Sequence, residues 1–207
     1  MLDIGVIAVV FGLIFVGELP DKSAIAGLVL STRFPWRWVF TGVAAAFLVH
    51  VVIAVAAGSL LQLLPHDAVE IVVTLLFLVG ASLIWREGEH EEDSERDAEM
   101  AKDEAEIADV PATAGFAKVA SLGFVTIFVA EWGDLTQIMT ANLAAKYDDP
   151  WSVAVGATLA LWAVGLLAML GGATLLRVLP MKWICRIAAV VMLGLAVYTG
   201  LGVAGVV

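Results

Sequence analysis

Long apolar stretches alternate with short polar joints along the chain, and this pattern predicts membrane-spanning helices. A helix needs about 20 apolar residues to cross about 30 Å of hydrocarbon. The stretches that reach or approach this length are residues 2–30, 38–64, 68–85, 115–145, 151–178 and 183–206. Pro65 and Pro180 follow the second and fifth stretches, where a helix does not readily continue. The sequence therefore predicts an all-α membrane protein with six transmembrane helices.

The composition agrees with this pattern. Hydrophobic residues make up 61% of the 207 positions and charged residues 15%, whereas soluble domains hold about 45–50% apolar and about 25% charged residues. A soluble domain is therefore excluded. The first stretch opens with Asp3 rather than with basic residues, so we expect a retained helix and not a cleaved signal peptide. The single cysteine, Cys185, excludes a disulfide framework and a multi-cysteine metal site within one chain.

The formal net charge of −10 is concentrated in one segment. Between Glu87 and Asp109 lie 12 of the 21 acidic residues and only two basic ones, Arg96 and Lys102. The remainder of the chain is neutral and has no basic patch, which excludes nucleic-acid binding. We interpret residues 87–112 as a solvated acidic linker, with a cation-binding regulatory segment as the alternative. This linker separates two predicted regions, residues 1–86 and 113–207.

The distribution of lysine and arginine predicts the orientation in the membrane. With six spans, nine basic residues fall in the loops of one side, and the other side has only Lys146. The nine are Arg33, Arg37, Arg86, Arg96, Lys102, Lys118, Arg177, Lys182 and Arg186. By the positive-inside rule, the linker is cytoplasmic and both termini lie outside. Because the chain is compact and shows no transit segment, we expect a multi-pass protein of a bacterial plasma membrane.

The two regions repeat one another. At a shift of 113 residues, the segment 15–23 aligns with 128–136, and polar positions coincide. The equivalent pairs are Glu18 with Glu131, Asp21 with Asp134, and Ser23 with Thr136. Each region holds three predicted spans, and because three is odd the second region enters the membrane from the opposite side. Such inverted repeats are common in secondary transporters, whose substrate site lies near the midplane.

Each repeated segment places two acidic residues near the middle of a predicted helix. An acidic side chain at the bilayer centre costs about 2.5–3.5 kcal/mol on insertion scales, so intramembrane acids are functional sites by default. A spacing of three residues puts Glu18 and Asp21 on one helix face, and Glu131 and Asp134 likewise. A helix-disrupting residue, proline or glycine, lies inside each pair, so we expect a kink that frees carbonyl oxygens there.

The acidic cluster predicts a cation site. If all four carboxylates ionise, Lys22 is the only basic residue within the spans, so protons or a bound cation must balance the charge. Oxygen ligands without a sulfur or imidazole cluster suit a hard divalent ion such as calcium or manganese. The predicted ligands are Glu18, Asp21, Ser23, Glu131, Asp134 and Thr136. When the ion leaves, the clustered carboxylates would take up protons, which predicts proton antiport.

His50 is a lone histidine within a predicted span, and its position in the second repeat is occupied by Gly165. A packing residue with satisfied hydrogen bonds and a proton relay both remain open for it. Asn142 and Thr140 are expected to serve helix packing, with the lining of a polar cavity as the alternative.

These residues resemble the Gdt family of calcium and manganese transporters, which carries two copies of Glu-x-Gly-Asp-Lys/Arg-Ser/Thr in an inverted repeat. The two copies here are Glu18-Leu19-Pro20-Asp21-Lys22-Ser23 and Glu131-Trp132-Gly133-Asp134-Leu135-Thr136. Proline replaces the motif glycine in the first copy, and leucine replaces the basic residue in the second. The resemblance implies that the motif acids bind manganese or calcium, and that the protein exports the ion from the cytoplasm in exchange for protons.

The expected partners are therefore divalent metal ions, protons and the lipid bilayer, with the metal ion as cargo and no further cofactor. The sequence does not indicate an oligomeric state. Three other functions remain open: a passive cation channel, a metal-sensing membrane protein, and a transporter of a different small cargo such as an amino acid. An intramembrane enzyme is the weakest alternative, because the paired carboxylates are not accompanied by a pairing of nucleophile and base.

Overall fold

The computed structural model describes residues 2–18, 22–61, 66–90, 101, 110–147, 149–178 and 181–203. Within these residues all the secondary-structure elements are α-helices. The helices are α1 (Ile4–Glu18), α2 (Lys22–Arg33), α3 (Trp36–Leu61), α4 (His66–His90), α6 (Phe116–Ala130), α7 (Leu135–Lys146), α8 (Pro150–Val178) and α9 (Met181–Val203). The all-α prediction is therefore confirmed for the described part of the chain.

The helices follow the predicted apolar stretches, with one difference. The second, third, fifth and sixth stretches correspond to α3, α4, α8 and α9. The fourth stretch, predicted as a kinked single helix, is divided into α6 and α7, whereas α1 and α2 of the first stretch flank residues 19–21, which lie outside the described residues. Among the described residues, α3 and the segment Pro150–Gly171 of α8 are long and apolar enough to cross a membrane on their own. Shorter apolar helices are Ile4–Glu18, Ile71–Leu83, Phe116–Ala130 and Ala189–Leu201.

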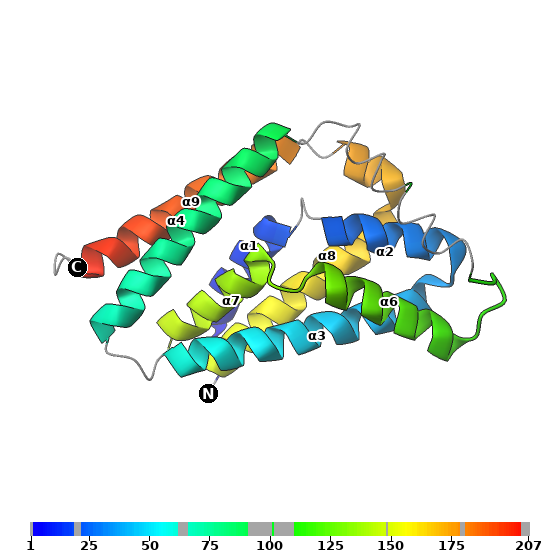
Figure 1. The fold of residues 1–207 in the computed structure, drawn as a ribbon, viewed down its shortest axis with the longest axis horizontal. Helices are drawn as coiled ribbons and strands as arrows, with labels where there is room; N and C mark the ends of the chain where they lie inside the picture. Colours follow the sequence, from blue (N-terminus) through cyan, green and yellow to red (C-terminus); the bar gives the residue numbers. More distant parts are fainter. Residues whose placement is uncertain are drawn as a thin grey trace.

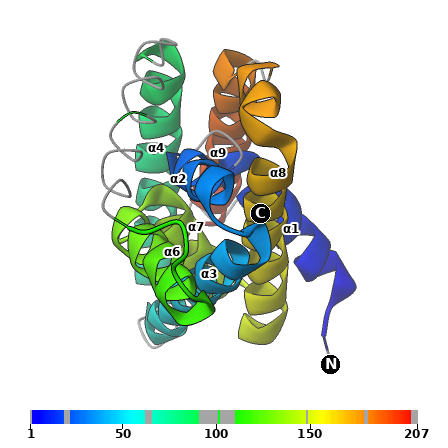
Figure 2. The ribbon, with the colours of Figure 1, turned by 90° about the vertical axis from the view of Figure 1, so that its right-hand side faces the viewer.

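The helices pack in related pairs around two long central helices. Helix α3 contacts α6 and α7, while α8 contacts α1 and α2. Helices α4 and α9 run side by side, and Figure 1 shows this pair at the left, apart from the remaining helices. Figure 2 views the molecule from the opposite end, with α2 and α6 in front. Helix α7 contacts α4, and α1 contacts α9, so the pair is joined to the remainder at α1 and α7. Most of the acidic linker, residues 91–100 and 102–109, lies outside the described residues.

Glycines allow α3 to approach α6 and α7 closely. A Cβ atom added to Gly42 would lie 1.9 Å from the carbonyl oxygen of Ala120, and one added to Gly58 would lie 2.2 Å from that of Ala141. Such distances are possible only for glycine, and small residues at helix contacts are typical of membrane proteins. Helix α3 is therefore held against both halves of the divided α6–α7 stretch.

Replacing Gly42 with alanine is expected to destabilise the protein, although alanine is the better helix former. The added methyl group would collide with backbone, and overpacking of this kind costs about 1–3 kcal/mol or more. The control is Gly12→Ala in α1, because a Cβ at Gly12 has no neighbour within 4 Å, and removing a helical glycine there gains about 0.5–1 kcal/mol. The measurement is the thermal unfolding midpoint in detergent. Equal midpoints for the two variants would contradict the close packing.

Candidate cation site

The break between α6 and α7 is built from the residues of the second motif. Helix α6 ends at Ala130, and Glu131 caps it with its N–H donating to the carbonyl of Ile127 at 2.9 Å. Gly133 then adopts φ +78°, a conformation that favours glycine. Asp134 caps the start of α7, where its Oδ2 accepts from the N–H of Thr136 at 3.1 Å and from the hydroxyl at 3.2 Å. The motif therefore ends one helix and begins the next.

Three of the predicted ligands meet at this break. One carboxylate oxygen from each of Glu18, Glu131 and Asp134 can be chosen so that all three lie within 4.8 Å of one another. Glu18 and Glu131 are buried, with 0% and 4% of their surface exposed, and Asp134 is half-buried. Glu18 is the last residue of α1. Three carboxylate oxygens at these distances form a set of ligands that suits a hard divalent cation.

The end of α1 lies close to α7. A Cβ added to Gly17 would lie 3.0 Å from the methyl carbon of Met139 and 3.8 Å from a methyl of Thr136. Because Gly17 has no side chain, the end of α1 approaches α7 closely. This approach carries the neighbouring Glu18 to the break.

The remaining predicted ligands differ in how the structure places them. Thr136 is buried, and its hydroxyl holds Asp134 in the capping position. Asp21 lies outside the described residues. Ser23 belongs to α2, but its side chain is outside the described part of the structure. The described cluster therefore joins the first acid of the first motif to both acids of the second.

Two further polar residues, His50 and Gln137, connect α3 to this break. His50 Nε2 lies 3.1 Å from the carbonyl oxygen of Phe128, and His50 Nδ1 lies 3.0 Å from Gln137 Nε2. Gln137 Oε1 accepts from the N–H of Gly133 at 2.9 Å. The sequence did not predict the contact between His50 and Gln137, because the two residues lie 87 positions apart. The available signal was a polar side chain within each of two predicted spans, one in each repeat.

A small hollow lies beside the carboxylates on the α7 side. Its lining residues are Phe47, His50, Val51, Ala54, Glu131, Thr136, Gln137, Thr140 and Leu161. Five of these carry polar or charged side chains, and Glu131 belongs to the cluster itself. Thr140 lines this hollow, which agrees with the alternative role that the sequence left open for it, the lining of a polar cavity. The hydroxyl of Thr140 donates to the backbone carbonyl of Thr136 at 2.7 Å.

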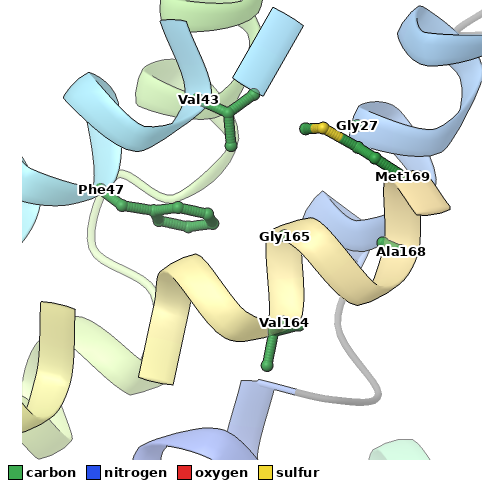
Figure 3. Close-up of a pocket in the computed structure, with 7 residues that line it drawn as sticks. All are labelled: Gly27, Val43, Phe47, Val164, Gly165, Ala168 and Met169. Atoms are coloured by element: carbon green, nitrogen blue, oxygen red, sulfur yellow. The ribbon is translucent and has the colours of Figure 1, made fainter. Parts of the chain in front are cut away.

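A second hollow lies on the α2 side and is apolar. Figure 3 shows its lining residues Gly27, Val43, Phe47, Val164, Gly165, Ala168 and Met169. Met169 passes directly over Gly27, since a Cβ added to this glycine would lie 3.2 Å from the methionine methyl. The two hollows thus differ in chemistry, and the polar one is the hollow that includes a carboxylate of the cluster.

Comparisons with known proteins show the family to which the chain belongs. The family model described as "Divalent cation/proton antiporter GDT1" matches residues 6–92 and 119–204, which include all the predicted ligands. GDT1-like protein sll0615 of Synechocystis is 33% identical over 167 residues, covering 77% of this chain and 79% of that protein. The chloroplast protein PAM71 of Arabidopsis thaliana is 31% identical over 205 residues. That match covers 91% of this chain and 55% of PAM71, so the chain spans about half its length.

GDT1-like protein 3 of Arabidopsis thaliana is 24% identical over 198 residues, covering 90% of this chain and 67% of that protein. No solved structure matches the chain. The family model nevertheless matches well over half of the sequence, on both sides of the acidic linker. The chain therefore belongs to the GDT1 family of divalent cation/proton antiporters, and it is a transporter and not an enzyme.

Proposed function

We propose that the protein exchanges manganese or calcium for protons and moves the metal out of the cytoplasm. The observation that carries this proposal is the cluster of Glu18, Glu131 and Asp134, whose carboxylate oxygens lie within 4.8 Å of one another. Carboxylates are the ligands that these hard cations prefer. Asp21 would join them as the fourth acid, and Ser23 and Thr136 would supply neutral oxygens. The family match supports the exchange of a divalent cation for protons.

The exchange follows from electrostatics. A bound divalent ion offsets the repulsion among the carboxylates and keeps them ionised. When the ion leaves, the repulsion returns, and the group lowers it by binding protons as a coupled set. Metal and protons thus compete for the same oxygens. The site would be occupied by one or the other in turn, which is the requirement for antiport.

The proposed architecture is a pair of inverted repeats, one formed by α1 to α4 and the other by α6 to α9. Helix packing supports it, because most helix contacts have a counterpart in the other half, although among the described residues the contacts of α4 with α7 and of α1 with α9 do not. Helix α1 contacts α8 as α6 contacts α3, and α2 contacts α8 as α7 contacts α3. Helices α4 and α9, the last of each half, contact each other. Six spans then result if α1 with α2, and α6 with α7, each cross the membrane once.

The proposed orientation in the membrane rests on the basic residues in the loops. In the proposed orientation the linker is cytoplasmic, α2 runs from the carboxylates to the cytoplasm and α7 runs from them to the outside. The polar hollow then lies on the outer side of the cluster, and the apolar hollow with Met169 lies on the cytoplasmic side.

The affinity for the metal is expected to fall as the pH falls. Protonation removes the negative charge that holds the ion, so binding is strongest at the alkaline end and is lost progressively on acidification. The measurement is isothermal titration of the purified protein with manganese, and separately with calcium, from about pH 8 to about pH 5. The tighter of the two ions identifies the preferred cargo. An affinity that does not change with pH would contradict competition at the carboxylates.

A further inference from the structure

A bridge of side chains spans the α6–α7 break from the neighbouring helix α3. His50 Nε2 bonds to the carbonyl of Phe128, close to the end of α6, at 3.1 Å. On its other side, His50 Nδ1 meets the Gln137 amide nitrogen at 3.0 Å. Gln137 then accepts the N–H of Gly133, just before α7, at 2.9 Å. The backbone on both sides of Glu131 is thereby tied to one residue of α3.

The chemistry of the partners fixes the order of donors in this bridge. A carbonyl oxygen only accepts, so His50 Nε2 carries the hydrogen and Nδ1 is the acceptor of the neutral ring. Gln137 must therefore present its amide nitrogen to His50, which leaves its oxygen for the N–H of Gly133. Each bond determines the next, and the network assigns both the histidine tautomer and the orientation of the amide.

The bridge satisfies backbone groups that the break leaves without regular helical partners. A helix end exposes its last carbonyls and the following helix exposes its first N–H groups. Here the N–H of Trp132 turns to the carbonyl of Val129 at 3.4 Å, so the last turn tightens and the carbonyl of Phe128 becomes available to His50. The His50 ring also stacks beside Phe128, with ring centroids 4.9 Å apart. Packing and hydrogen bonding therefore hold the break in one geometry.

We propose that His50 and Gln137 are positioning residues for the transported cation, which hold Glu131 and Asp134 at the spacing that the ion requires. This inference rests on the proposed function and extends it beyond the carboxylates. His50 then acts through the backbone of the break and not as a proton carrier. Partners that orient metal ligands in this way commonly determine metal affinity, and their loss costs about 10–100-fold.

The bridge forms at the second motif, and the equivalent positions of the repeat cannot form it at the first. At the shifts that align the two halves, Gly165 occupies the position of His50 and Ala24 occupies that of Gln137. Glycine and alanine have no polar side-chain atom, so these two positions cannot form the same bridge at the first motif. The second motif is therefore the half of the site whose acids are held by α3.

The test compares four variants in proteoliposomes by their KM and kcat for manganese. His50→Leu and Gln137→Leu each remove the bridge and are expected to raise KM about 10–100-fold. The double variant should be no worse than the poorer single one, because both substitutions break the same network. His50→Gln places an amide N–H near the former Nε2 and is expected to recover most of the affinity.

The matched control is Thr199→Val, which removes a buried hydrogen bond between α4 and α9, away from the cluster. Thr74 donates to Thr199 at 2.9 Å. This variant should keep the wild-type KM, since a general loss of stability lowers the amount of active protein and not its affinity. Thermal unfolding midpoints of all variants verify that they are folded. His50→Gln should also retain the wild-type number of protons moved per metal ion.

An unchanged KM in His50→Leu and Gln137→Leu would overturn the inference. So would a loss of proton movement in His50→Gln with normal affinity, because that result assigns His50 to proton transfer. Both outcomes require that the wild-type protein transports manganese. Absence of manganese and calcium transport by the wild type would instead refute the proposed function, so the two failures are distinguishable.

Discussion

Asp134→Asn is expected to abolish metal transport and to leave the fold intact. Asp134 has two roles, as the cap of α7 and as a member of the carboxylate cluster. Asparagine is as good a helix cap as aspartate, so its side-chain oxygen can still accept the N–H of Thr136. It lacks the negative charge, which the divalent ion requires. Because the loss of a supporting residue alone costs about 10–100-fold, we expect at least about a 100-fold loss when a ligand itself is replaced.

The measurement is the initial rate of manganese uptake by proteoliposomes, together with the thermal unfolding midpoint. Asp149→Asn is the matched control, because Asp149 also caps a helix and accepts the N–H of Ser152 at 3.1 Å, but lies outside the cluster. The control should transport at the wild-type rate. Normal flux in Asp134→Asn would remove this acid from the mechanism.

Glu18→Gln carries the second largest expected effect. Glu18 is completely buried at the end of α1, and glutamine has nearly its shape, so the variant tests charge and not packing. It lies in the first half of the chain, whereas the other described acids of the cluster lie in the second. We expect the affinity for manganese to fall at least about 100-fold in Glu18→Gln. The affinity should fall less in Glu18→Asp, because aspartate keeps the charge on a shorter side chain.

Manganese titration of purified Glu18→Gln provides the measurement. An unchanged affinity in this variant would show that the ion is held without the first half of the chain. The proposed site between the two halves would then be wrong, even if Asp134→Asn were inactive. The two variants therefore test different parts of the same cluster.

The sequence predicted the helices and the family because both depend on local patterns. Apolar stretches of sufficient length indicated each helix, and the charged positions repeated at a shift of 113 residues indicated the two motifs. The sequence also placed a disruption between Glu131 and Asp134, at Gly133. It predicted a kink there, and the structure instead has a complete break, because the positive φ of Gly133 and the cap formed by Asp134 start a separate helix.

Contacts between distant residues could not be predicted in the same way. His50 and Gln137 lie on different helices, and no spacing rule relates them, so the sequence left His50 open between packing and a proton relay. The contrast between the polar hollow at Thr140 and the apolar hollow at Met169 likewise depends on how α3 and α8 cross their neighbours. The angle and distance at which two helices cross depend on the side chains of both. For example, the absence of a side chain at Gly42 lets the backbone of Ala120 approach α3 closely.

The most direct test of divalent cation/proton exchange is metal flux into proteoliposomes under an imposed pH gradient, with internal pH recorded at the same time. Manganese and calcium are assayed in parallel, and Asp134→Asn proteoliposomes give the background. We expect the metal and the protons to move in opposite directions across the membrane, and both flows to disappear in the variant. Metal flux that leaves the internal pH unchanged and ignores the gradient would contradict the exchange and indicate a passive cation pathway.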